Sequence, residues 1–143
     1  MSKFAKRISV SHIEIVAYQL AKATMSWSEP IPAFKTRFPN ILESCVNTPF
    51  QTYNRKDLYP TIFNKSAMLF YLMVKNHPFQ NGNKRIAVTT LLVFLFLNKY
   101  WLSVAPQKLY NLALWVAQSD AELRDATVAG LVEFIEKYSK KIH

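Results

Sequence analysis

Nine consecutive residues, His77 to Arg85, contain most of the side chains in this sequence that could do chemistry together. Their sequence is His-Pro-Phe-Gln-Asn-Gly-Asn-Lys-Arg, between the apolar stretches Ser66–Val74 and Ile86–Leu97. A histidine can exchange a proton near neutral pH, and lysine and arginine attract phosphate. Gly82, one of only two glycines, indicates a sharp turn or a close approach of the backbone. If residues 86–97 are helical, residues 82–85 lie at the N-terminus, where backbone N–H groups and the helix dipole attract anions. The segment therefore predicts a phosphate cradle with a base at its edge.

Each of these residues also has a simpler interpretation when it is taken alone. An isolated histidine that follows a helix is more often structural than catalytic. Phe79 is best interpreted as an apolar plug that holds the loop to the core. Lys84 and Arg85 could be solvated charges at a helix start, but cations there oppose the dipole and need a compensating anion. The complete pattern therefore decides the interpretation.

That pattern resembles the signature of the Fic/Doc family, most closely its death-on-curing (Doc) branch. The family pattern is His-x-Phe-x-(Asp/Glu)-Gly-Asn-(Gly or Lys)-Arg. Upstream, further segments are similar to Doc-type proteins in order and spacing: Leu42-Glu43-Ser44, Thr48-Pro49, Asp57-Leu58-Tyr59-Pro60 and Lys75-Asn76. The resemblance covers about residues 8–140. It implies one all-α domain over residues 1–143, a Fic-type helical bundle with a small flap before the motif-bearing helices.

The resemblance also implies roles for the motif. His77 would be the general base that takes the proton of a target hydroxyl as that hydroxyl attacks a nucleotide phosphate. Gly82 and Asn83 would form an anion hole, and Arg85 would clamp a phosphate. The implied co-substrates are ATP, with Mg²⁺, and a protein bearing a Ser, Thr or Tyr hydroxyl. A base and a cationic cradle suffice for such a transfer, because it depends mostly on positioning and charge neutralisation.

Lys84 separates two reactions within the family. Members that transfer AMP usually carry glycine here, which leaves room for the terminal phosphates of the nucleotide. The Doc branch carries lysine. The resemblance to its known member implies that ATP is used in the reverse orientation, so that its γ-phosphate goes to a threonine of elongation factor Tu. Lysine therefore favours a Doc-like toxin phosphotransferase, with AMP transfer (AMPylation) as the alternative.

Asn81 is the main departure from the family pattern. The family usually places Asp or Glu here, which binds the magnesium ion bridging the phosphates. An amide oxygen can bind Mg²⁺ but brings no charge to this hard cation. No acidic residue lies between Asp57 and Asp120 to replace it. Three outcomes stay open: a weaker kinase, an enzyme with another phosphate donor, or a catalytically degenerate module that binds an anionic partner.

The polar segment Thr48–Tyr59 would be an ordinary surface loop by composition alone. The resemblance implies a flap, often a short β-hairpin, that holds the backbone of the target over the active site by strand addition. The flap residues are Phe50, Gln51, Thr52, Tyr53, Asn54 and Arg55.

No inhibitory Ser/Thr-x-x-x-Glu motif is present, since none of the six glutamates follows a Ser or Thr by four residues. The similarity to antitoxin-paired Doc proteins therefore implies restraint by an antitoxin chain acting in trans.

Composition sets outer limits on the class of protein. The length of 143 residues suits one domain with a real core. One cysteine and the absence of an apolar signal core favour the cytoplasm, and the twelve apolar residues 86–97 are fewer than the ~20 that a membrane helix needs. The net charge of +9 favours an anionic partner. Nucleic acid is not expected, because no nucleic-acid motif or basic helix face is present.

Apolar spacing predicts six helices. A capping box of Ser11 and Glu14 starts the first, and Asn40 caps the second. Residues 26–39, with three prolines, are expected to be a loop, and residues 119–125 a connection. The expected helices are Ser11–Met25, Asn40 to about Asn47, one that starts at Pro60 or Thr61 and ends near Asn76, Asn83–Asn98, one opening at Pro106, and one from about Thr127 to Lys140.

Overall fold

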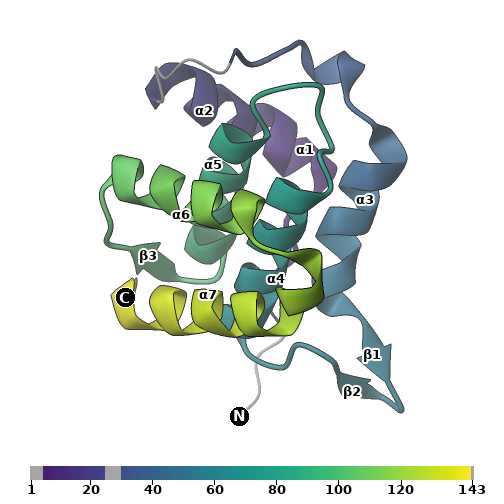
Figure 1. Ribbon diagram of the computed structural model, residues 1–143, viewed down its shortest axis with the longest axis vertical. Helices are drawn as coiled ribbons and strands as arrows, with labels where there is room; N and C mark the ends of the chain where they lie inside the picture. The colour runs from purple at the N-terminus through teal and green to yellow at the C-terminus, as the bar shows by residue number, and fades with distance from the viewer. Residues whose placement is uncertain (1–4, 25–29, 143) are drawn as a thin grey trace.

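Helix α5 (Asn83–Leu97) runs through the middle of the helical bundle (Figure 1). The computed structural model describes residues 5–24 and 30–142. Eleven of the fifteen residues of α5 are buried, as expected for a helix that is apolar on nearly every side. The prediction of a central helix in an all-α fold is confirmed.

The remaining elements follow one another along the chain with short connections. The N-terminal helix consists of α1 (Val10–His12), a π-helical turn (Ile13–Ala17) and α2 (Tyr18–Thr24). The other helices are α3 (Pro39–Asn47), α4 (Ile62–Lys75), α6 (Pro106–Gln118) and α7 (Arg124–Tyr138). Helix α5 packs against the N-terminal helix, α4 and α6, whereas α3 and α7 pack against α4. The 3-10 turns are Phe34–Thr36, Thr48–Phe50 and Ala121–Leu123, and the strands are β1 (Thr52–Tyr53), β2 (Lys56–Asp57), β3 (Tyr100–Leu102) and β4 (Ser139–Lys141).

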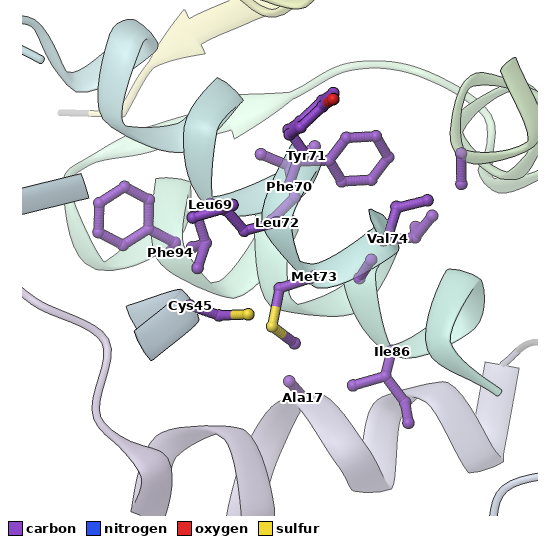
Figure 2. Packing of buried hydrophobic residues seen from close by; sticks show 14 of the residues in the cluster. Ala17, Cys45, Leu69, Phe70, Tyr71, Leu72, Met73, Val74, Ile86 and Phe94 are labelled. Carbon is purple, nitrogen blue, oxygen red and sulfur yellow. The ribbon is translucent and has the colours of Figure 1, made fainter. Parts of the chain in front are cut away.

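The core joins the N-terminal helix, α3, α4 and α5. Figure 2 shows Met73 of α4 pointing toward Cys45 of α3 and Ala17 of the π-helical turn. All three side chains are fully buried. α4 and α5 also pack directly against each other, and the loop between these two helices carries the His77–Arg85 motif.

The predicted hairpin in the polar segment is present. β1 and β2 pair antiparallel, with Thr52 opposite Asp57 and Tyr53 opposite Lys56. The two residues between the strands, Asn54 and Arg55, both have positive φ angles, as a type I′ turn requires. A second antiparallel pair, β3 with β4, was not predicted, because each strand has only three residues.

The predicted ends of three helices are wrong. The first helix is capped by Ser9 with His12 rather than by Ser11 with Glu14, because Ser9 is the residue with extended backbone. α3 begins at Pro39 with no side-chain cap, so Asn40 is not its cap. α7 begins at Arg124 and ends at Tyr138, where the chain turns into β4. Met25 and residues 26–29 of the expected loop lie outside the described residues. No described helix is both long and apolar enough to cross a membrane.

Candidate active site

The motif loop leaves α4 in a left-handed turn at His77. Asn76 caps the C-terminus of α4, and His77, directly after it, has φ of +51°. This position after a helix is commonly glycine, because a side chain there is strained. His77 is exposed, so the turn directs its imidazole away from the core. A strained, exposed histidine is a typical feature of a functional site.

Asn83 holds the loop closed from the first turn of α5. Its Oδ1 accepts a hydrogen bond from the Phe79 N–H at 2.9 Å, and its Nδ2 donates to the Phe79 carbonyl at 2.8 Å. The same Nδ2 lies 3.5 Å from Nδ1 of His77, a long contact. Asn83 therefore closes the loop and lies beside the imidazole, and its place in an anion hole stays a prediction.

Phe79 is the plug that the sequence predicts. Its side chain is 1 % exposed, with ring centroids 5.5 Å from Tyr18 and 5.9 Å from Phe34. This contact anchors the loop to the N-terminal helix and to the 3-10 turn at residues 34–36.

Gly82 is the N-cap of α5 and has φ of +72°. A Cβ atom here would lie 2.7 Å from Cδ1 of Ile31 and 2.9 Å from the carbonyl oxygen of Pro30. Both the turn and the close approach predicted for this glycine are therefore present. Sequence reasoning did not find Pro30 and Ile31, because nothing in their types indicates that this distant loop lies over the glycine.

The first turn of α5 supplies backbone N–H groups that have no acceptor four residues earlier within the helix. Lys84 is half-buried at this turn. Arg85 is 5 % exposed, and its Nη2 donates to the Ala21 carbonyl at 2.8 Å, which joins α5 to α2. Phosphate binding by Lys84 and Arg85 stays a prediction.

Asn81 is exposed, and its Oδ1 accepts a hydrogen bond from the Gly82 N–H at 2.8 Å. This hydrogen bond leaves the second lone pair of the amide oxygen for a cation, so Asn81 could supply one uncharged ligand. The described residues contain no group of three or more His, Cys, Asp or Glu side chains that could hold a metal ion. Since Mg²⁺ prefers charged oxygen ligands, this donor set does not fit a strong site, and no step below depends on a metal.

The structure does not bring the predicted flap to the motif. The β1–β2 hairpin precedes the N-terminus of α4, whereas His77 follows its C-terminus (Figure 1). Fourteen residues of helix separate the two by about 20 Å. Phe50 lies outside the hairpin, in the preceding 3-10 turn, and packs edge-on against Phe94. Target positioning by residues 50–55 stays a prediction, and a bound peptide would need about six extended residues to reach His77.

The bundle and its motif loop define a helical protein of a known class. The sequence model described as "Fic/DOC family" matches residues 8–95, which is more than half of the chain. The chain therefore belongs to the Fic/DOC family, and the resemblance found in residues 77–85 is confirmed.

A relative within this family is the toxin Doc of Mycolicibacterium smegmatis, which is 34% identical over 64 residues. The alignment covers 45% of this chain and 49% of that protein, so the chain matches about half of the length of this relative. No solved structure gives a significant match.

Proposed function

We propose that this protein is a Doc-like phosphotransferase, a toxin that moves a phosphate from ATP to a hydroxyl side chain of a protein target. The observation that carries the proposal is the placement of the His77 imidazole beside Asn83, at the N-terminal end of α5. A base and an anion-binding helix terminus thereby share one rigid loop.

In the proposed reaction, His77 takes the proton of the target hydroxyl while the hydroxyl oxygen attacks the γ-phosphorus of ATP. The new bond joins the phosphorus to the target, the bond to the β-phosphate oxygen breaks, and ADP leaves. The N–H groups of the first turn of α5, with Lys84 and Arg85, would meet the charge on the phosphate oxygens. Asn83 would keep His77 in position.

Lys84 supports transfer of phosphate rather than AMP. Lys84 is half-buried at the position where AMP-transferring relatives need room, and its ammonium group would attract the terminal phosphates. Transfer of AMP is the closest alternative. By analogy with the matched toxin Doc, we also propose that an antitoxin chain restrains this protein in the cytoplasm.

The decisive experiment uses ATP labelled separately at the α- and γ-phosphates, with the full chain, Mg²⁺ and bacterial lysate. We expect a protein labelled only from the γ-phosphate, with labelling lost by at least about a hundredfold in His77→Ala. Gln80→Ala is the matched control, because Gln80 is exposed on the same loop and has no assigned role. It should keep full activity.

Labelling from the α-phosphate would instead make the protein an AMP transferase. The absence of any His77-dependent label would contradict the enzyme proposal and favour a module that only binds an anionic partner. The Asn81→Asp variant tests the metal separately. We expect it to reach half-maximal rate at a lower Mg²⁺ concentration, because a carboxylate brings the charge that the amide lacks.

A further inference from the structure

A cavity lies at the C-terminal end of α5, the end away from His77. Its volume is about 680 Å³, and it is lined by the N-terminal segment, the hairpin, the start of α4, the end of α5 and the β3–β4 pair. Five cationic residues are among its fourteen lining residues: Lys6, Arg7, Lys65, Lys99 and Lys141. We call this space the basic cavity.

The basic cavity concentrates charge well beyond the average of the chain. About a tenth of the residues line it, yet they include five of the eighteen Lys and Arg residues. Asp57 is the one lining carboxylate, and it already accepts a hydrogen bond from Lys65 Nζ at 3.0 Å. Because like charges around one cavity repel each other, the arrangement favours an anion between them.

Three of the cationic residues, Lys6, Lys99 and Lys141, have backbones that are anchored by hydrogen bonds to other segments. Asn98 accepts a hydrogen bond from the Lys6 N–H at 2.7 Å and donates to the Lys6 carbonyl at 3.0 Å. Lys141 pairs with Tyr100 in the β3–β4 ladder, and the Ile142 N–H donates to the Lys99 carbonyl at 2.8 Å. Anchored backbones reduce the entropy that a bound ligand must overcome.

Two further cations have fixed head groups. The Arg7 guanidinium lies 4.4 Å from the centre of the Phe50 ring, with Nη1 3.4 Å from Oδ1 of Asn47. Lys65 is 3 % exposed, and its Nζ donates to Asp57 and to the Tyr59 carbonyl. Because Asp57 and the Tyr59 carbonyl already compensate the buried Lys65 ammonium, a bound anion would contact mainly Lys6, Arg7, Lys99 and Lys141.

We propose that the basic cavity binds a small polyphosphate anion. Its volume lies within the range of ligand sites, and the cations come from separate segments around the space, so a chain of phosphates could contact several of them at once. Arg7 and Lys65 already lie over the Phe50 ring, so this ring is not counted on to stack with a base of the ligand. The proposal needs only the chain of phosphates. The proposal does not depend on the chemistry at His77.

The test follows backbone amide signals by NMR while sodium tripolyphosphate is added to the full chain at low salt. We expect shifts at Lys6, Arg7, Lys99 and Lys141. Signals that move only at residues 82–86 would place the anion at the motif and overturn the proposal. A parallel titration with ATP separates the sources. Equal affinity means that the phosphate chain alone is recognised, and tighter binding means a nucleoside polyphosphate; both support the site.

Two neighbouring lysines give a matched pair of variants. Lys141 lines the cavity, whereas Lys140 pairs with Trp101 in the same strand and, by alternation, faces the other side. Both are exposed, and each substitution by alanine removes one positive charge. Lys141→Ala should weaken binding about tenfold, and Lys140→Ala less than twofold.

Equal weakening in both variants would show nonspecific attraction to a basic protein and overturn the proposal. An acidic peptide that moves the same amides at lower concentration than tripolyphosphate would also overturn it, because the occupant would then be a protein segment.

Discussion

Each end of α5 has an asparagine whose amide binds both the N–H and the carbonyl of one other residue. At the N-terminal end, Asn83 holds Phe79, four residues earlier, and both hydrogen bonds are buried. At the C-terminal end, Asn98 holds Lys6, ninety-two residues away, and those bonds are exposed. The same chemistry therefore closes a local loop at one end and joins distant segments at the other.

The two ends differ in what they leave accessible. At the motif end, Arg85 is buried against Ala21, and Gly82 is covered by Pro30 and Ile31. At the cavity end, Lys6, Lys99 and Lys141 have fixed backbones and exposed side chains. A rigid motif suits chemistry that needs precise positions, and an open basic cavity suits binding by charge.

The largest expected effect is at Gly82. Gly82→Ala should lower the free energy of unfolding by about 3 kcal/mol, because it combines a positive φ with a Cβ that would clash with Pro30 and Ile31. Urea unfolding measures the change. Gly130→Ala in α7 is the control: its φ is not positive and its Cβ would lie 3.3 Å from Trp115, so the change should stay within about 1 kcal/mol. Equal losses would show that the motif turn is not special.

The next largest loss of stability is expected from substituting the two asparagines at the ends of α5. Asn83→Ala should cost about 2–3 kcal/mol of unfolding free energy, because it leaves the buried N–H and carbonyl of Phe79 without these bonds. Asn98→Ala should cost about 1 kcal/mol, since water can replace its exposed bonds to Lys6. Urea unfolding of both variants makes the comparison. A larger loss for Asn98→Ala would reverse our ranking of the two ends.

A smaller effect is expected from the ion pair at the basic cavity. Asp57→Asn removes the charge opposite Lys65, whose ammonium group is nearly buried. Asp57 is itself half exposed, so solvent screens the pair, and we expect a loss of about 1–2 kcal/mol in thermal or urea unfolding. Glu122→Gln, at an exposed site, should change stability by less than about 0.5 kcal/mol. Unchanged stability in Asp57→Asn would mean that water already solvates Lys65.

The smallest effect is a pH dependence of folding stability caused by Cys45 in α3, the helix that runs from the motif end to the hairpin. Burial raises the pKa of the Cys45 thiol to about 12 from its ordinary value of 9.0. The unfolded chain loses this proton first, so this contribution to stability is complete well below pH 9 and is lost as pH rises through 9 toward 12. The loss at pH 9 should be about 0.4 kcal/mol. Urea unfolding between pH 7 and 10 measures it, and Cys45→Ala should lack this component. The same slope in both proteins would contradict the assignment.

The sequence predicted the parts of the molecule that depend on neighbouring residues. The motif loop from His77 to Arg85 is contiguous, so its glycine turn, its apolar plug and the helix that follows could be inferred from residue types. The hairpin was also expected, and Asn54 tolerates its left-handed turn. Helix ends were less predictable, as at Ser9, because several nearby residues could have served as the cap.

Contacts between distant segments could not be predicted in this way. No pattern indicated that Pro30 lies over Gly82, that Arg85 binds Ala21, or that β4 pairs with β3. The sequence also gave no sign that the hairpin and the motif stand at opposite ends of α4.

By itself, then, the amino-acid sequence determined the all-α class, the central apolar helix and the chemistry available at residues 77–85, because helical periodicity and a contiguous loop depend on local spacing. Tertiary structure alone decided which residues cover Gly82, how far the hairpin lies from His77, and that five cations surround one cavity. The physical reason is that these features depend on how helices pack, and packing brings together residues whose separation in sequence carries no signal.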